Sequence, residues 1–339
     1  MNKKRVLAML LAGAMALSMT ACGGGNSAST DGSSNDGGAS ASGGSYKVSV
    51  ILKTLAAEYW QYVKSGAEDY ASEHSDKVTV EVKGPSSETA FDEMQNMIET
   101  DLSSGTYDGI VISPLQSDTA AQLVSGTKLP IVAIDTNFTA PEVKSFVGTG
   151  NEAAAKKGGE AAVEAAKAAG WTDIKCIEIA GVQGDQTNTA RMNGYKAGVE
   201  EAGGTFLSDE VQYADATADR ATTAMEAIMQ THPEGIAIIC ANNDDMAMAA
   251  ARAAQGHDAY KNTIFLGFNG DRAACEAILA GQMTMSVAQM AYEMGYKAVE
   301  TMVQVLDGET VDEFVDSGSD VVTPDNAQER LDTLKTQLH

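Results

Sequence analysis

Positive charge is scarce in this sequence. Lysine and arginine contribute 23 residues against 47 aspartates and glutamates, which leaves a formal net charge of −24. A surface of this sign repels the phosphates of nucleic acids and of anionic lipid headgroups, so we expect neither as a partner. Solubility at a crowded cell surface is the simplest reason for such acidity.

Cysteine and histidine are equally sparse, with four of each. No histidine stands at ligand spacing from another His, a Cys or a carboxylate, so no metal site is expected. Cys176 and Cys240 lie inside apolar runs, which predicts buried thiols rather than a disulfide. Catalytic motifs such as G-x-S-x-G, H-E-x-x-H and a Cys/His pair are missing, and the adjacent Asp244 and Asp245 would point in different directions. The sequence therefore predicts a protein that is not an enzyme.

Residues 148–153 are similar in pattern to a cofactor-binding motif. Gly148 to Ala153 follows a strand and opens a helix, as the glycine-rich turn of a dinucleotide site does. It falls in the middle of the chain, however, and no acidic residue ends the following strand, Ile174 to Ile179. We interpret the stretch as a hinge and a helix start, and we expect no cofactor.

The N-terminus has the layout of a secretory signal peptide over residues 1–21: residues 3–5 are basic, and Val6 to Met19 is an apolar run. The run is shorter than the ~20 residues that a membrane-spanning helix needs. It ends at Ala21-Cys22, followed by glycines, which resembles the signal of bacterial lipoproteins. That resemblance implies a diacylglycerol on Cys22, and a plain signal peptide with an incidental cysteine is the alternative.

Small and polar residues fill the segment from Cys22 to residue 45. Such a segment cannot bury enough apolar surface to offset its ordering entropy, so we expect a flexible linker. A lipid and a linker together predict a domain anchored to the outer face of the cytoplasmic membrane and not inserted in it. Without the lipid, the expected location is periplasmic.

Beyond Tyr46, apolar runs alternate with amphipathic segments. Runs of Val and Ile without polar alternation are typical of parallel strands that are covered on both faces. The expected strands are 48–52, 78–82, 109–112, 130–134, 174–179, 206–213, 235–240, 263–267 and 283–288. The expected helices are 59–72, 90–102, 117–124, 152–169, 189–202, 218–230, 244–254, 272–279 and 292–306.

The alternation restarts after Gly148, and repeated β-α-β units build doubly wound sheets. The sequence therefore predicts an α/β protein with two doubly wound parallel-sheet lobes. We expect the first lobe over residues 46–149 plus about 290–318, and the second over 150–289 plus about 319–339. The chain would then cross between the lobes several times and form a hinge.

Ligands of open α/β sheets bind beyond the carboxyl ends of the strands. The residues that follow the expected strands are mostly polar, charged or aromatic, a mixture that suits the hydroxyls and the C–H faces of carbohydrates. These segments are Lys53 to Trp60, Ser113, Asp135, Thr149, Gln183 to Arg191, Asn242 to Asp245, Phe268 to Asp271, and Gln289.

Taken in order, these segments resemble the ribose-, allose- and galactose-binding proteins of bacterial sugar importers, from about Tyr46 to the end of the chain. The matching motifs are Lys53-Thr54-Leu55 with Tyr59-Trp60, Ile134-Asp135, Ala190 to Tyr195, Ala241 to Met248, Gly267 to Gly270, and Gly281 to Gln289. The resemblance implies a fold like that of type I periplasmic binding proteins. It also implies that Tyr59 and Trp60 stack on a sugar ring. The residues implied to bond its hydroxyls are Lys53, Asp135, Arg191, Asn243, Asn269 and Gln289.

Structural roles are the alternative for several of these residues. Tyr59 and Trp60 could be core aromatics, and Arg191 could bind a structural carboxylate. Asn and Asp both suit helix N-caps, and we expect Asp244 to cap the helix that it opens while Asn243 reaches the ligand.

The sequence also departs from the family pattern. Ala57-Glu58 replaces an Asn-Pro that often precedes the aromatic pair, Asn269 replaces a usual Asp, and an aromatic residue near Ala218 is missing. Lys53 adds a cation, as in the allose-type members. These departures leave the ligand open among another hexose, a polyol and an anionic sugar derivative.

The resemblance implies an extracytoplasmic solute-binding protein, expected to be a monomer, that delivers a monosaccharide to the permease of an ABC transporter. A sensor that presents the sugar to a chemoreceptor or a histidine kinase is the alternative. A repressor of the lac type shares the fold, but it needs a helix-turn-helix and a basic surface, which the signal peptide and the charge exclude. An extracellular carbohydrate enzyme is a further alternative, one without a recognisable catalytic motif.

Overall fold

The structure is a computed structural model and describes residues 45–338. These residues belong to one compact unit. The predicted signal peptide, the predicted lipidation site Cys22 and nearly all of the predicted linker lie outside the described residues.

The first of two sheets has six strands in the order β12-β5-β4-β3-β1-β2, and every neighbouring pair is parallel. The strands are β1 (Tyr46–Ile51), β2 (Val78–Lys83), β3 (Gly109–Ile112), β4 (Ile131–Ile134), β5 (Val143–Gly148) and β12 (Phe314–Asp316). Its helices are α1 (Glu58–Glu73), α2 (Phe91–Ser104), α3 (Ser117–Val124) and α9 (Ala291–Leu306).

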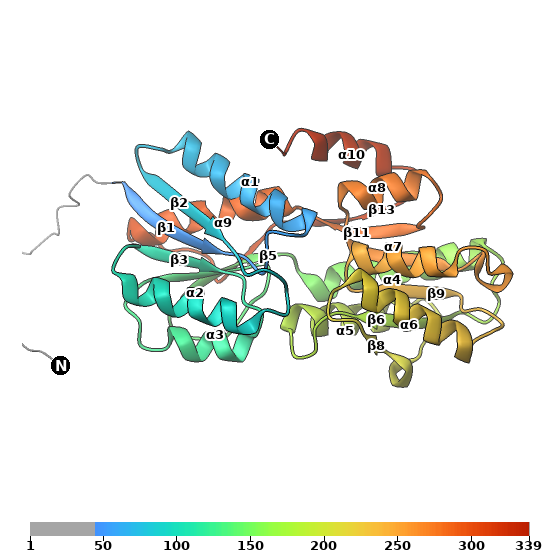
Figure 1. Ribbon diagram of the computed structural model, residues 1–339. Helices are drawn as coiled ribbons and strands as arrows, with labels where there is room; N and C mark the ends of the chain where they lie inside the picture. The colour runs from blue at the N-terminus through green and yellow to red at the C-terminus, as the bar shows by residue number, and fades with distance from the viewer. Residues whose placement is uncertain (1–44, 339) are drawn as a thin grey trace, which may run out of the picture. The chain divides into compact units, whose positions relative to one another are not determined.

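Helices cover both faces of this sheet, α1 and α9 on one and α2 and α3 on the other (Figure 1). Side chains on β3 alternate accordingly: Val111 packs in the cluster of α1 and α9, whereas Ile110 and Ile112 pack in the cluster of α2 and α3. Helices α1 and α9 approach closely at two glycines. A Cβ on Gly66 would lie 2.0 Å from the carbonyl oxygen of Tyr292, so any larger residue there would force the helices apart.

The second sheet has seven strands, with the path β13-β11-β10-β9-β6-β7 and β8 paired to β6. The pairing of β11 with β13 is antiparallel, and the others are parallel. The strands are β6 (Lys175–Ala180), β7 (Thr205–Phe206), β8 (Gln212–Tyr213), β9 (Ile238–Ala241), β10 (Ile264–Asn269), β11 (Met285–Gln289) and β13 (Ser319–Val322).

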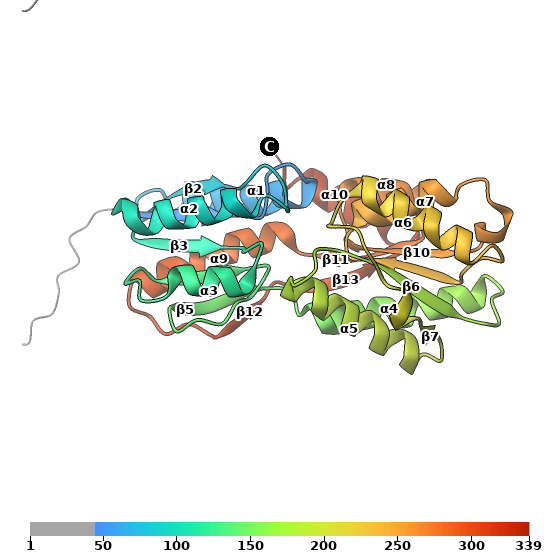
Figure 2. The same ribbon diagram turned by 60° about the horizontal axis from the view of Figure 1, so that its bottom comes forward.

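Two groups of helices sandwich the second sheet, α4 and α5 on one face and α6, α7 and α8 on the other (Figure 2). These helices are α4 (Asn151–Ala168), α5 (Gln186–Glu201), α6 (Ala218–Thr231), α7 (Asp244–Ala254) and α8 (Arg272–Leu279), and α10 (Ala327–Lys335) packs against α8. The prediction of two doubly wound parallel-sheet lobes is confirmed.

Three parts of the chain differ from the prediction. Strand β5 was expected only as a strand before Gly148, without bounds. The single strand expected over 206–213 is wrong, because β7 and β8 are separate two-residue strands divided by a 3-10 turn, Ser208–Glu210. Strands β12 and β13 and helix α10, which follow residue 306, were not predicted. The two strands are short and partly exposed, so they carry little of the apolar signal that marks the central strands.

The described chain crosses between the two sheets at three places. Strand β5 leads to α4, β11 leads to α9, and β12 leads to β13. Two of these crossovers are joined, since the backbone N–H of Ser317 donates to the carbonyl oxygen of Gly148 at 2.8 Å. The third is held by Arg330 of α10, whose guanidinium donates to the carbonyl oxygen of Gln289 at 2.6 Å. Gln289 also pairs with Ser319 in the ladder of β11 and β13, so the three connections between the lobes adjoin one another.

Candidate functional site

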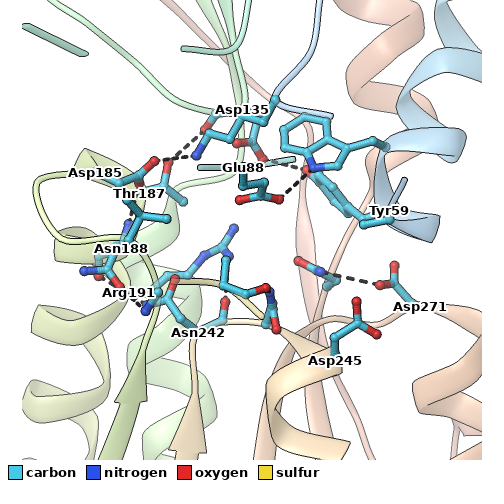
Figure 3. Close-up of a pocket in the computed structure, with 18 residues that line it drawn as sticks. Tyr59, Glu88, Asp135, Asp185, Thr187, Asn188, Arg191, Asn242, Asp245 and Asp271 are labelled. Atoms are coloured by element: carbon cyan, nitrogen blue, oxygen red, sulfur yellow. Dashed lines mark hydrogen bonds and ion pairs between the residues drawn. The ribbon is translucent and has the colours of Figure 1, made fainter. Parts of the chain in front are cut away.

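A cavity of about 70 Å³ lies where the carboxyl ends of strands from both sheets meet (Figure 3). The first lobe contributes Lys53, Ala57, Tyr59, Trp60, Glu88 and Asp135. The second lobe contributes Gly181, Val182, Asp185, Thr187, Asn188, Arg191, Ala216, Asn242, Asn243, Asp245, Asn269 and Asp271. Most of these residues carry a carboxylate, an amide or another hydrogen-bonding group.

Seven of the eight residues proposed from the sequence line this cavity, and Gln289 does not. Gln289 is fully buried at the end of β11 and donates from Nε2 to Oδ1 of Asn269 at 3.0 Å. Its own Oε1 has no hydrogen-bond partner among the described residues. Gln289 therefore lies behind Asn269, whose amide it orients.

A buried ion pair joins the two lobes across the cavity. Nζ of Lys53, just beyond β1, lies 2.5 Å from Oδ2 of Asp185, and both side chains are less than a tenth exposed. The other oxygen of Asp185 caps α5 by accepting from the backbone N–H of Asn188 at 2.8 Å. Burial alone would lower the pKa of Lys53, but the charges of Asp185 and Asp135 raise it above its ordinary value. Lys53 is therefore a fixed cation whose charge is already matched.

A second contact between the lobes lies next to this ion pair. The hydroxyl groups of Thr136 and Thr187 are 2.6 Å apart and both are buried. Thr136 also donates to Oδ2 of Asp135 at 2.9 Å. The Lys53–Asp185 ion pair and the Thr136–Thr187 contact thus join the ends of β1 and β4 to the start of α5 in the second lobe.

Tyr59 and Trp60 open helix α1 at the edge of the cavity. Their rings pack edge to face, with centroids 4.9 Å apart. The Tyr59 hydroxyl donates to Oδ1 of Asp135 at 2.8 Å, and Nε1 of Trp60 donates to Oε1 of Glu88 at 3.0 Å. Each aromatic side chain is thus bonded to a carboxylate that faces the same cavity.

Asp135 follows β4 in the left-handed backbone region, with φ of 61°. This region is uncommon for residues other than glycine, and Asp and Asn are among the side chains that tolerate it best. The conformation turns the chain sharply at the strand end and leaves the carboxylate beside Tyr59.

Arg191 projects from α5 beneath the cavity and is buried. Its Nε donates to Oδ1 of Asn151 at 2.9 Å, and a terminal nitrogen donates to the carbonyl oxygen of Asn242 at 2.8 Å. The guanidinium also stacks on the ring of Phe268, 3.8 Å from its centroid. These partners are neutral, so the expected alternative of a structural carboxylate is wrong, and the charge of Arg191 is available at the cavity.

The expectation that Asp244 caps α7 is wrong. Asn243 is the N-cap of α7, and its Oδ1 accepts from the backbone N–H of Met246 at 2.9 Å. Asn243 has an extended backbone, from which a side chain can reach that N–H, whereas Asp244 is already helical. Asp244 is instead buried and accepts from the Ser286 hydroxyl at 2.6 Å.

Sequence reasoning did not propose several polar residues of the cavity. Six of them fall inside the strand-end segments but were not proposed as ligand contacts: Asp185, Thr187, Asn188, Asn242, Asp245 and Asp271. Glu88 was missed entirely, because it lies in the loop after β2, a strand end that had not been considered. A search of every strand end of the first sheet would have found Glu88.

Glu178 is a buried carboxyl group directly behind the cavity. It lies in β6 with no exposed surface, and its Oε1 accepts from Nδ2 of Asn242 at 3.2 Å. Its Oε2 has no hydrogen-bond partner among residues 45–338. Burial raises the pKa of Glu178 from 4.5 to about 8, so the group is mostly protonated at neutral pH.

The described residues bear on three further expectations. Cys176 and Cys240 are buried free thiols with sulfur atoms 3.3 Å apart, which confirms that they do not form a disulfide. Within residues 45–338, no group of three or more His, Cys, Asp or Glu is arranged to hold a metal ion. In the same part of the chain, no helix has both the length and the apolarity needed to cross a membrane.

The chain belongs to the periplasmic binding protein family. Residues 48–310, most of the chain, match the family described as periplasmic binding protein domain. This membership agrees with the two-lobed α/β fold and with a cavity at strand ends. The family is one of binding proteins, which confirms the expectation that the chain is not an enzyme.

Individual relatives cover nearly the whole domain. The D-allose-binding periplasmic protein of Escherichia coli is 30% identical over 264 residues, which span 75% of this chain and 82% of that protein. The ribose import binding protein of Escherichia coli is 27% identical over 268 residues, 78% of this chain and 86% of that protein. A carbohydrate transporter solute-binding protein from Agrobacterium radiobacter, solved with D-arabinose, has a TM-score of 0.77 at 24% identity, and the match covers 87% of this chain and 99% of that one.

The raised pKa of Glu178 makes a prediction about stability. Between pH 4.5 and about 8 the unfolded chain loses this proton while the folded chain keeps it, so the free energy of unfolding falls as pH rises. The slope from one such group is at most ~1.4 kcal/mol per pH unit. Glu178→Gln keeps an acceptor for Asn242 and does not titrate, so its stability relative to wild type should increase from pH 5 to pH 8.

Urea unfolding of both proteins across this pH range measures the difference. Glu226→Gln, a change of the same kind on the exposed face of α6, is the control and should follow wild type. Parallel pH curves for wild type and Glu178→Gln would contradict a raised pKa of Glu178 in the folded protein.

Proposed function

We propose that this chain captures a monosaccharide or a related polyol between its lobes and delivers it to the permease of an ABC transporter. The composition of the cavity wall carries the proposal, because two aromatic side chains and a majority of charged and amide groups meet at the strand ends of both lobes. Aromatic faces suit the C–H faces of a sugar ring, and the polar groups suit its hydroxyls. The relatives named for D-allose and ribose, and the similar structure that holds D-arabinose, support the same class of ligand.

Each proposed contact has a chemical reason. Tyr59 and Trp60 would contact the ring, and the charged members Lys53, Asp135 and Arg191 would bond its hydroxyls. In this proposal Asn269 bonds a hydroxyl of the ligand directly. Gln289 does not touch the ligand but orients the Asn269 side chain, because its amide donates to Asn269. Asn243 uses Oδ1 to cap α7 and one N–H to bond the carbonyl oxygen of Ala216, which leaves its second N–H for the ligand.

We propose that the two lobes close on the ligand by a hinge motion about the three crossovers. The first lobe would comprise residues 46–149 with about 290–318, and the second 150–289 with about 319–339. Hinge closure around a ligand is the general behaviour of periplasmic binding proteins. The ion pair between Lys53 and Asp185 supports this, since it is a contact between the lobes that a hinge motion could make and break.

We propose further that the mature chain is a monomer held at the outer face of the cytoplasmic membrane by a lipid on Cys22. The apolar run before Cys22 and the polar linker after it support this location.

Mass spectrometry of the protein from its native membrane should therefore find a mature N-terminus at Cys22 that carries a diacylglycerol. A Cys22→Ser variant should be released into the soluble fraction, because it lacks the sulfur that is acylated. An unmodified Cys22 in the mature protein would contradict the anchor and leave the solute-binding role intact.

Ligand binding itself is tested by thermal-shift screening of sugars and polyols, followed by calorimetry of Asp135→Asn with the best ligand. This variant suits the left-handed backbone and can still accept from Tyr59. Its Nδ2 can donate to the Thr136 hydroxyl, whose own hydrogen can turn to Thr187, so the ligand-free protein should keep its melting temperature. Loss of a charged hydrogen bond of ~1.5–3 kcal/mol should weaken binding roughly tenfold to a hundredfold.

The matched control is Asp118→Asn, an exposed position on α3 away from the cavity, which should bind as wild type does. Equal affinity of Asp135→Asn and wild type would place the ligand elsewhere. A panel in which nothing stabilises the protein would overturn the proposed function.

A further inference from the structure

The cavity holds an excess of negative charge. Its carboxylates are Glu88, Asp135, Asp185, Asp245 and Asp271, and its cations are Lys53 and Arg191. Lys53 is matched by Asp185, and Asp135 already accepts two hydroxyl hydrogen bonds. The remaining cation, Arg191, donates to neutral oxygens and stacks on an aromatic ring. Within residues 45–338, no ion pair reaches Glu88, Asp245 or Asp271.

Asp271 shows most clearly that a partner is absent. It occupies the N-cap position of α8, where an Asp side chain usually accepts from the helix backbone, yet it makes no such bond. The residue is 8% exposed and lines the cavity instead. Oδ2 receives one long contact of 3.4 Å from Nδ2 of Asn269, and Oδ1 has no hydrogen-bond partner among the described residues. Burial of a carboxyl group in this state favours its neutral form, and a bound donor with a positive charge would favour the ionised form instead.

The surroundings of Asp271 are acidic. The side chain of Asp245 lies on the same side of the cavity (Figure 3). Burial first, and then the charges of Asp244, Glu58 and Asp245, raise the pKa of Asp271 well above its ordinary value. The guanidinium of Arg330 lies behind this region but donates to the backbone oxygens of Gly270 and Gln289 rather than to a carboxylate.

Two kinds of ligand group could satisfy Asp271, a hydroxyl and an ammonium. A hydroxyl has one hydrogen to donate and leaves the repulsion between Asp271 and Asp245 unchanged. An ammonium has three hydrogens and a positive charge, so it can bond Asp271 and offset the repulsion between Asp271 and the exposed Asp245. Coulombic attraction is several times stronger in a partly buried cavity than in water, so the charge decides between them.

We propose that the ligand is an amino sugar or an amino polyol whose ammonium group binds Asp271, with the neighbouring charge of Asp245 adding to the attraction. This inference rests on the proposed function, because the ligand binds in the same cavity. The hydroxyl groups of the ligand keep the protein partners that are proposed for them above. The inference opposes the anionic sugar derivative left open by the sequence, since Lys53 is already paired with Asp185.

A panel of matched ligands tests the proposal by calorimetry at about pH 7, where a sugar amine is largely charged. Each set contains a neutral sugar or polyol, its amino analogue and the uncharged N-acetyl derivative of that analogue. The neutral members are D-glucose, D-galactose, D-mannose and myo-inositol, and the amino members are the 2-amino-2-deoxy sugars and an aminodeoxy-inositol. At least one amino member should bind at least about tenfold more tightly than its neutral partner. That preference should shrink as ionic strength rises.

Asp271→Asn supplies the second readout. The variant should fold normally, because the side chain makes no cap bond, and a melting curve without ligand checks this. Its affinity for the amino ligand should fall at least about tenfold, and its affinity for the neutral partner should change far less. Asp332→Asn, an exposed position on α10 outside the cavity, is the matched control and should leave both affinities unchanged.

The outcomes separate this inference from the proposed function. A neutral sugar that binds as tightly as its amino analogue, or an amino preference that Asp271→Asn leaves intact, overturns the inference and leaves the solute-binding role standing. A panel in which no member of any set binds overturns both.

Discussion

The direction of the strands is the constraint on which the site depends. Parallel strands of both sheets point their carboxyl ends toward the same cavity, so residues at the ends of several of these strands line it whatever their chemistry. Covered strands leave few polar positions inside the sheets, and the strand ends therefore collect them. Lys53, Asp135, Asn242 and Asn269 come from four different strands and reach one cavity for this reason alone.

Charge then determines how the two lobes meet and what the cavity leaves unsatisfied. Asp185 serves both lobes at once, since one oxygen caps α5 and the other holds Lys53. This pairing removes one of two cations from the cavity wall, and Arg191 is oriented by neutral oxygens. The cavity therefore has more carboxylates than cations. A ligand with hydrogen-bond donors or a positive charge can bond the carboxylates that no cation of the protein pairs with.

The sequence predicted the elements whose physical signal is strong. Central strands are apolar runs, and the helices α3, α7 and α8 were predicted with the bounds that they have. Short edge elements such as β12 and β13 were not predicted, because half-exposed strands of three or four residues carry almost no periodicity. The cap of α7 was misassigned because Asn and Asp cap equally well. Only the backbone angles show that Asn243 precedes the helix and Asp244 belongs to it.

Predicting the site was easier than predicting the interactions within it. Strand-end position together with the family resemblance pointed to eight residues, of which seven line the cavity. Neither could foresee that Lys53 is paired with Asp185 or that Gln289 lies behind Asn269. These pairings depend on how the second lobe meets the first, which no local pattern encodes. The most direct test of the account is small-angle scattering with and without a sugar or polyol that stabilises the protein. The account predicts a smaller radius of gyration with the ligand bound, and an unchanged radius at saturation would contradict closure of the lobes around it.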